Sequence, residues 1–386
     1  MEHGLYIHLP YCRSLCPYCA FAKAPLHHAE PKRLLDALRR ETDMARADAA
    51  WERPRTIFFG GGTPTALEPQ DLRATLDGVR SSWDLKRVRE WTAEANPEGL
   101  TDEKLAILRE GGVDRLSLGV QSLEPAVLRS LGRIHKPERA LQAVADARRA
   151  GFRNVSVDLM VAVPGETEGG VLRAITAFVD LGVQHLSVYA LQVEPGTPLA
   201  GKVERGATPE VDQDTAADRY ERIGERLARA GYRHYEVSNW ALPGFESRHN
   251  EGYWTRRPYL GLGPGAHSFD GAARWRNEED VTRYYERVEA GQLPREDRQA
   301  MNPESAATEA IFLALRRARG LRRRHAERLA GPALAGWSEW ARTAGAVRLD
   351  PPGRIRPTER GLLLSHEISS DLLARAGRID SPAPRC

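Results

Sequence analysis

Short apolar runs, rich in β-branched and aromatic residues, alternate along the N-terminal half of the chain with longer segments whose apolar positions recur at helical spacing. The short runs predict six strands, at residues 4–9, 56–59, 91–95, 115–119, 155–161 and 185–190. The periodic segments predict six helices, at residues 31–49, 69–81, 102–109, 137–150, 169–181 and 209–230. This alternation is typical of βα units around a parallel sheet.

The number of units and the polar residues at the strand ends favour an open barrel over a doubly wound sheet, although periodicity alone does not separate the two. We therefore expect an α/β fold with a partial (β/α)6 barrel. Residues 235–240 predict one further strand, and residues 261–265, with three glycines and a proline, predict a loop.

The pattern changes near residue 278, where helical spacing becomes dominant. Four further helices are predicted there, at residues 281–290, 304–319, 322–329 and 334–344, followed by two extended pieces at 347–349 and 354–356. We expect a domain boundary near residue 275, with a barrel domain at 1–275 and a smaller, mainly helical domain with a winged-helix-like hairpin at 276–386. Residues 379–386 are expected to fray.

Composition limits the class of protein. Hydrophobic residues make up 41% of the chain, charged residues 28%, and the net charge is +3, as in soluble globular proteins. No apolar run approaches the roughly 18 residues that span a bilayer, and the first residues lack the features of a secretory signal. We expect a cytosolic protein.

The cysteines carry the most chemical information. Cys12, Cys16 and Cys19 lie within eight residues of one another, whereas Cys386 ends the chain, which makes a poor disulfide framework. The cluster follows the first predicted strand and therefore lies at the C-terminal mouth of the barrel, where barrel enzymes place their chemistry. Three thiolates would leave one iron of a [4Fe–4S] cluster without a protein ligand. The alternative is a structural zinc site completed by His8, His27 or His28, although the second cysteine pair usual in zinc sites is absent.

The segment Tyr6-Ile7-His8-Leu9-Pro10-Tyr11-Cys12, with Cys16 and Pro17-Tyr18-Cys19 after it, resembles the radical S-adenosylmethionine (SAM) superfamily. The resemblance is to the branch that holds oxygen-independent coproporphyrinogen III oxidases and the HemW heme chaperones. It implies that the three cysteines hold a [4Fe–4S] cluster, that SAM chelates the fourth iron, and that an electron from the reduced cluster cleaves SAM to a 5′-deoxyadenosyl radical.

A glycine-rich turn, Gly60-Gly61-Gly62-Thr63-Pro64, follows the second predicted strand. Without Cβ atoms, a ligand can reach the backbone there, and free amide and carbonyl groups can bond the ends of an amino acid. Many such turns are simply tight turns. This one resembles the superfamily's GGGTP motif, which implies that it binds the SAM amino group.

Polar residues also interrupt later strands: Glu94, Gln121 and Asp158. Buried polar groups cost roughly 1–3 kcal/mol when unpaired, so several at one mouth indicate a polar ligand, whereas each alone could pair inside the barrel. The resemblance implies that these three and Arg133 bind the ribose and methionine ends of SAM, and that Tyr6 and Tyr18 flank the cluster and the adenosine.

Three features distinguish members of this branch. The coproporphyrinogen oxidases carry a further cysteine where this chain has Phe21, and they usually begin with an extension ahead of the barrel. The segment His249-Asn250-Glu251-Gly252-Tyr253-Trp254 resembles the HNxxYW signature of HemW, which implies that His249, Asn250, Tyr253 and Trp254 bind heme, with His267 as a second contact. From the residues alone, the alternative is a turn whose aromatic side chains pack against the barrel.

We therefore expect a heme chaperone that binds heme, a [4Fe–4S] cluster and SAM and delivers heme to respiratory enzymes, including enzymes at the membrane surface. The alternative is a radical SAM decarboxylase of coproporphyrinogen III. We assign no catalytic residue, expect a homodimer, and interpret the arginine-rich stretch at 316–324 as a solvated helix end rather than a nucleic-acid site.

Overall fold

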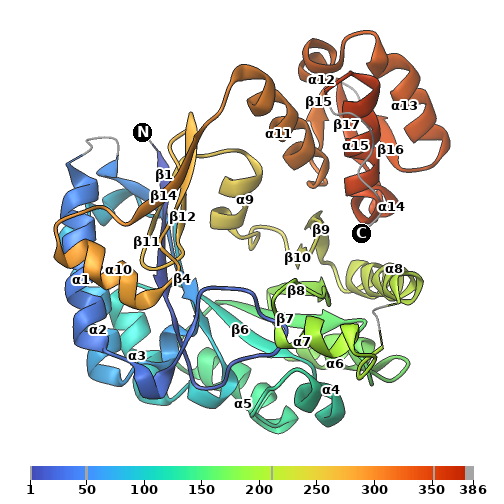
Figure 1. Ribbon diagram of the computed structural model, residues 1–386. Helices are drawn as coiled ribbons and strands as arrows, with labels where there is room; N and C mark the ends of the chain where they lie inside the picture. Colours follow the sequence, from blue (N-terminus) through green and yellow to red (C-terminus); the bar gives the residue numbers. More distant parts are fainter. Residues whose placement is uncertain (1, 48–50, 210–211, 351–352, 379–386) are drawn as a thin grey trace.

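The computed structural model describes residues 2–47, 51–209, 212–350 and 353–378. Its main feature is a curved sheet of twelve strands (Figure 1). The barrel consists of six parallel strands that pair in chain order: β1 (His3–Leu9), β4 (Pro54–Gly61), β5 (Glu90–Ala95), β6 (Arg115–Gln121), β7 (Asn154–Val161) and β8 (His185–Ala190). An order that never reverses is that of a barrel and not of a doubly wound sheet. The predicted partial barrel is confirmed, and it remains an open sheet.

Helices cover the outer face of this sheet (Figure 1). They are α1 (Pro31–Arg46), α2 (Pro69–Ser82), α3 (Asp102–Gly111), α4 (Pro125–Ser130), α5 (Pro137–Arg149), α6 (Gly170–Asp180), α7 (Pro198–Glu204) and α8 (Gln213–Arg229). The short strands β2 (Tyr11–Cys12) and β3 (Ala24–Pro25) pair with each other beyond the end of β1. All six helices predicted between and after the strands are present, and α4 and α7 are additional short helices in the loops at the mouth.

Side chains alternate along the strands between two different environments. Those on the outer face, such as Leu5, Ile57 and Val157, are apolar and belong to one buried core with the helices. The alternate positions face the interior of the barrel and are mostly polar: Thr56, Glu90, Thr92, Glu94, Arg115, Ser117, Ser156, Asp158, His185 and Ser187. We call this interior the lumen. Its lining suits a polar ligand and does not suit an apolar core.

The sheet extends beyond both ends of the predicted barrel. Beside β1 lie β11 (Tyr259–Leu262), β12 (His267–Phe269), β13 (Ala273–Asn277) and β14 (Arg295–Ala300), and beside β8 lie β10 (Asn239–Ala241) and β9 (Arg233–Glu236). The single strand predicted at 235–240 is thus wrong, because Val237 and Ser238 turn the chain into an antiparallel hairpin. The loop predicted at 261–265 begins inside β11, which pairs in parallel with β1.

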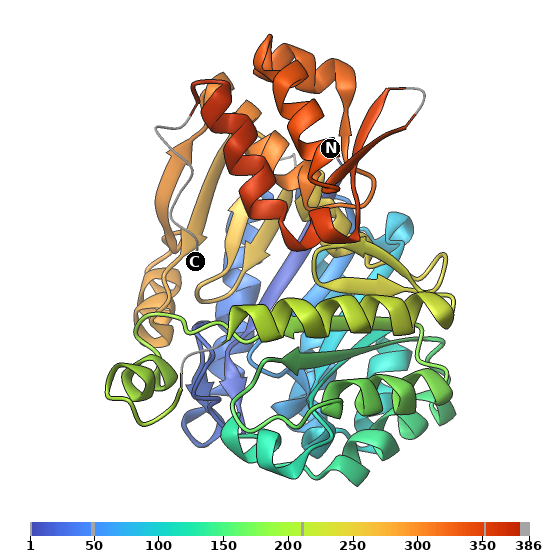
Figure 2. The same ribbon diagram turned by 90° about the vertical axis from the view of Figure 1, so that its right-hand side faces the viewer.

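The C-terminal part has a hydrophobic core of its own, which runs from Ile311 to Leu373. It contains α11 (Pro303–Leu315), α12 (Arg323–Ala330), α13 (Ala333–Thr343), α14 (Glu359–Leu363), α15 (Ser365–Arg375) and a sheet of β15 (Leu321–Arg322), β17 (Arg354–Pro357) and β16 (Val347–Asp350). The predicted hairpin is β16–β17. Figure 2 shows this unit lying above the barrel.

The expected boundary near residue 275 lies inside β13, which pairs with β14 in the main sheet. Helix α10 (Val281–Glu289) lies between these two strands and packs against α1. We therefore propose that the second domain begins near Pro303. Residues 379–386, where fraying was expected, lie outside the described residues, as does Cys386.

The two units are joined by main-chain pairing at the edge of the sheet. Glu236 and Arg317 form an antiparallel bridge. The amides of Val237 and Ala318 donate to the carbonyls of Arg316 and Tyr235, both at 3.0 Å. Among the described residues, no helix is long and apolar enough to cross a membrane.

Candidate functional site

The three clustered cysteines lie on the loop after β1, at the C-terminal mouth of the barrel. Cys12 ends β2, and the amide of Cys19 donates to the carbonyl of Cys16 at 3.3 Å in a turn. All three side chains are half-buried and free of disulfides. Burial raises the pKa of the Cys12 thiol to about 11, so binding of a metal there must displace a proton.

The donor set fits a cluster better than a single zinc ion. No group of three or more His, Cys, Asp or Glu side chains in the described part of the chain is close enough to hold one metal ion. A zinc ion needs its ligands within about 2.3 Å of one point, whereas each thiolate of a [4Fe–4S] cluster binds a different iron. His8, one proposed zinc ligand, already bonds Tyr6 Oη (3.0 Å) and the Ala22 carbonyl (2.7 Å) through its two ring nitrogens.

The glycine-rich turn brings β4 against the cysteine loop. A Cβ on Gly62 would lie 2.5 Å from the Pro10 carbonyl carbon, and one on Gly61, where φ is +101°, would overlap the His8 ring. The amides of Gly62 and Thr63 donate to Leu9 and Tyr11 carbonyls at 2.8 and 2.9 Å. The Gly61 amide donates to Glu94. Contrary to the expectation of free amides, those of Gly61, Gly62 and Thr63 are all engaged, and the turn would bind an ammonium group through its carbonyl oxygens.

A chain of polar contacts connects this turn with the cysteines. Cys12 Sγ lies 3.8 Å from Thr63 Oγ1, and Asn96 Nδ2 donates to the same oxygen at 3.1 Å. Arg133 donates to Asn96 Oδ1 (3.2 Å) and to the Gly119 carbonyl (2.7 Å), and its Nη1 lies 3.8 Å from Cys16 Sγ. Arg133 Nε has no partner. This guanidinium therefore holds the loop in place and still has a donor for an anionic group.

Glu94 on β5 and Asp158 on β7 both lie on the lumen side of the sheet, with β6 between their strands. Ser117 Oγ is 3.3 Å from both Asp158 carboxylate oxygens. Burial, with a smaller contribution from the charge of Asp158, raises the pKa of Glu94 to about 8. Burial also raises the pKa of Asp158. Two buried carboxyl groups in the lumen are suited to accept hydrogen bonds from hydroxyl or ammonium groups of a ligand.

The other predicted contacts at the mouth are placed as follows. Tyr6 faces the lumen and lies near Phe58, with ring centroids 6.1 Å apart. Tyr18 packs against a separate apolar cluster at the mouth. Gln121 ends β6 with φ at +68°, a strained conformation for a residue other than glycine that is common at functional sites.

Replacement of Glu94 by glutamine should flatten the pH dependence of stability. Because the pKa of Glu94 is about 8 when folded and about 4.3 in an unfolded chain, folding takes up a proton between these values and stability is lost as pH rises through this window. The slope of the free energy of unfolding against pH should differ between wild type and Glu94→Gln by up to about 1.4 kcal/mol per pH unit, which corresponds to one proton. Urea unfolding from pH 5 to 8 measures it. The exposed Glu103→Gln should show the wild-type slope.

The HNxxYW segment forms a short helix, α9 (Arg248–Trp254), at the opposite end of β1 from the cysteines. The Glu90 carboxylate accepts the amides of Arg248 and His249, both at 2.9 Å, and so holds the start of α9. The His249 ring bonds Thr56 Oγ1 through Nδ1 (2.9 Å) and Tyr253 Oη through Nε2 (2.8 Å). Burial lowers the pKa of His249 to about 3.

Helix α9 thus closes the floor of the lumen. In this conformation both ring nitrogens of His249 are engaged in hydrogen bonds, and ligation of an iron atom would require one of these bonds to open. Asn250 is half-buried on the same helix. Trp254 Nε1 is buried without a partner. His267 is exposed on β12 at the mouth, far along the sheet from α9.

Two residues of the site carry no signal in the sequence. Asn96 bridges Thr63 and Arg133, but it follows β5 as an ordinary turn residue would. Arg115 is fully buried at the start of β6, and its charge lowers the pKa of Glu90 and Asp158 against the effect of burial. Its Nε has no hydrogen-bond partner.

Several known proteins resemble this chain over most of its length. The model of the radical SAM superfamily matches residues 6–178. A Mycobacterium tuberculosis protein named heme chaperone HemW is 41% identical over 321 residues, 82% of each chain. Its Bacillus subtilis namesake is 36% identical over 94% of this chain and 95% of its own. The solved structure of Escherichia coli coproporphyrinogen III oxidase (HemN), a radical SAM enzyme, covers 96% of this chain and 90% of its own with a TM-score of 0.81; at 22% identity it shows the fold alone.

Proposed function

The chain belongs to the HemW heme chaperone family of the radical SAM superfamily, and from this membership we propose that it binds heme and passes it to other proteins, with a [4Fe–4S] cluster and SAM at the barrel mouth. The observation that carries the proposal is the extent of the similarity. The superfamily model ends at residue 178, but the likeness to the Bacillus subtilis heme chaperone covers 94% of the chain. It therefore includes most of the chain beyond the parallel barrel strands.

Different residues at the mouth would bind the cluster and SAM. Cys12, Cys16 and Cys19 would each bind one iron, which leaves the fourth iron for SAM. Thr63 and Arg133 hold the cysteine loop in register with β4 and β5. When bound, the reduced cluster and SAM supply one-electron chemistry. Glu94 and Asp158, with Gln121, would accept hydrogen bonds from the polar groups of SAM, and Tyr6 and Tyr18 would flank it.

Heme binding is proposed at α9. Trp254 supplies an aromatic face with an unpaired donor, and Tyr253 and Asn250 lie on the same helix. His249 would ligate iron only after its bonds to Thr56 and Tyr253 open. A chaperone must release its cargo. Because the His249 imidazole can return to its hydrogen bonds with Thr56 and Tyr253, release of the iron is favoured.

This part of the proposal predicts different effects on heme affinity from two substitutions. His249→Ala should weaken heme binding at least tenfold, because the axial imidazole is lost. Thr56→Val removes one competitor for the ring and should leave the affinity unchanged or higher. Heme titration by visible absorption, with thermal melts to show that both variants fold, measures this. If a folded His249→Ala protein bound heme with wild-type affinity, the ring would have only a structural role.

The function as a whole is tested on the reconstituted protein under anaerobic conditions. We expect stoichiometric heme binding and no turnover of coproporphyrinogen III. Phe21 stands exposed where the oxidases have a further cysteine, so the loop lacks that thiol. Formation of protoporphyrinogen with consumption of SAM would instead establish the decarboxylase.

The cellular location, the oligomeric state and the recipients of heme are proposed on the same basis. We propose that the protein acts in the cytosol as a homodimer and delivers heme to respiratory enzymes, including enzymes at the membrane surface. Light scattering of the purified chain tests the dimer. Heme transfer to an apo respiratory enzyme, followed by the change in the heme spectrum, tests delivery.

A further inference from the structure

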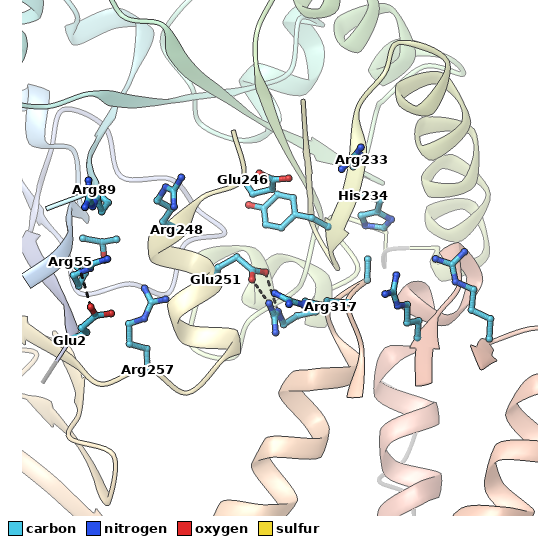
Figure 3. Close-up of a pocket in the computed structure, with 16 residues that line it drawn as sticks. Glu2, Arg55, Arg89, Arg233, His234, Glu246, Arg248, Glu251, Arg257 and Arg317 are labelled. Atoms are coloured by element: carbon cyan, nitrogen blue, oxygen red, sulfur yellow. Dashed lines mark hydrogen bonds and ion pairs between the residues drawn. The ribbon is translucent and has the colours of Figure 1, made fainter. Parts of the chain in front are cut away.

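A second cavity, of about 700 Å³, lies at the N-terminal end of the barrel strands, between the barrel and the C-terminal unit (Figure 3). Glu2, which precedes β1, and Thr56 at the start of β4 line it. The cysteines follow the other end of β1, about 20 Å away at 3.3 Å per residue. The cavity is therefore separate from the cluster and SAM site.

The lining of this cavity is strongly cationic. Nine of its sixteen lining residues are arginines and three are glutamates. In Figure 3, Arg55, Arg89, Arg248 and Arg257 lie along one side, and Arg233 lies on the other. The guanidinium groups thus surround the space from both sides and do not form a single patch.

Most of these charges are not neutralised by the protein. Among the residues that the structure describes, Arg89, Arg233, Arg248, Arg257 and Arg319 have no carboxylate within ion-pair distance. Of the glutamates, Glu2 pairs with Arg55 at 3.3 Å and Glu251 pairs with Arg317. Collecting unpaired like charges costs free energy, and natural sequences keep such clusters where an anion binds.

The charge continues on the neighbouring surface of the C-terminal unit. Arg354 lies among further cations there, and burial together with the charges of Arg319 and Arg322 lowers its pKa. An anion in the cavity would contact arginines of both units. It would add to the existing links between them, which include the bridge at Glu236, the ion pairs Arg317–Glu251 and Arg274–Glu309, and the contact between His234 and Glu359.

We propose that this cavity binds a small organic or inorganic polyphosphate and thereby fastens the C-terminal unit to the floor of the barrel. The volume is that of a typical small-molecule site. Guanidinium groups bind phosphate oxygens in pairs. Most of the lining side chains are charged, which suits an anion better than the broad apolar faces of a porphyrin.

The test is calorimetric titration of the full chain with tripolyphosphate, and separately with ATP, at physiological ionic strength. We expect a dissociation constant below about 100 μM, a range in which ligand at a hundredfold excess stabilises the fold measurably. The double variant Arg89→Gln/Arg233→Gln should bind at least tenfold more weakly. Both side chains are exposed and unpaired, so the variant should fold.

The matched control is Arg53→Gln/Arg222→Gln, which removes the same charge from exposed arginines outside the cavity. It should bind as wild type does. Equal weakening in both variants would show a general charge effect and overturn the proposal. Tighter binding of ATP than of tripolyphosphate would identify a nucleotide, and equal binding a free polyphosphate.

Two further titrations separate this site from the proposed heme function. Heme that displaces tripolyphosphate in competition would assign the cavity to the heme propionates and overturn a polyphosphate site. A short RNA or DNA that binds more tightly than tripolyphosphate and is lost in the cavity variant would make it a nucleic-acid site instead. The cavity variant should retain wild-type heme and iron content, so failure here leaves the chaperone proposal untouched.

Discussion

Replacement of Cys16 by serine should give a folded protein that no longer holds an iron–sulfur cluster. Each thiolate is expected to bind one iron, and a serine hydroxyl stays protonated near neutral pH and is a poor ligand for these irons. Iron after anaerobic reconstitution should fall from about four atoms per chain to below one. The visible absorption of the cluster should disappear with it.

The fourth cysteine supplies the control for this experiment. Cys386→Ser should reconstitute fully, because three cysteines suffice for a cluster that leaves one iron open. The half-buried position of Cys16 beside Arg133 suggests little loss of stability in its serine variant. Loss of iron in Cys386→Ser as well would contradict the assignment of the open iron to SAM.

Replacement of Arg115 by methionine should destabilise the protein by about 3 kcal/mol at pH 8, since breaking a buried charge arrangement leaves its partners uncompensated. Arg115 is the cation among Glu90, Glu94 and Asp158. The deficit should shrink at pH 5.5, because Glu94, whose pKa is about 8, is then protonated. Urea unfolding at both pH values measures this.

Two variants make the Arg115 result specific. Arg115→Lys keeps a positive charge and should recover part of the lost stability. Arg153→Met removes an exposed arginine from the loop before β7 and should have an effect below about 0.5 kcal/mol. A deficit in Arg115→Met that does not change with pH would indicate lost packing and not uncompensated charge.

The strands of the barrel could be predicted because each is a run of residues bounded by turn signals, and the predicted bounds differ from the observed ones by two residues or fewer. The hairpin β9–β10 was missed for the opposite reason. Its turn at Val237 and Ser238 contains neither glycine nor proline, so the segment resembles one continuous strand.

Helix α9 could not be predicted from the sequence for a different reason. Seven residues with little apolar periodicity would not form a stable helix alone. The Glu90 carboxylate holds its first amides and Thr56 fixes His249, and both partners are more than 150 positions away. The cysteine loop could be identified because its ligands are local. Asn96 and Arg115 act only through contacts that the folded barrel creates.

The two outer edges of the twelve-stranded sheet determine how the protein can associate with other chains. An open sheet usually presents unpaired backbone groups to any passing strand, which risks polymerisation. Here the bridge at Arg317 covers part of the β9 edge. The other edge strand, β14, has the sequence Arg-Glu-Asp-Arg-Gln-Ala and is mostly exposed. Charged edge strands resist strand addition, so any assembly of this protein should use its side-chain surfaces and not its sheet.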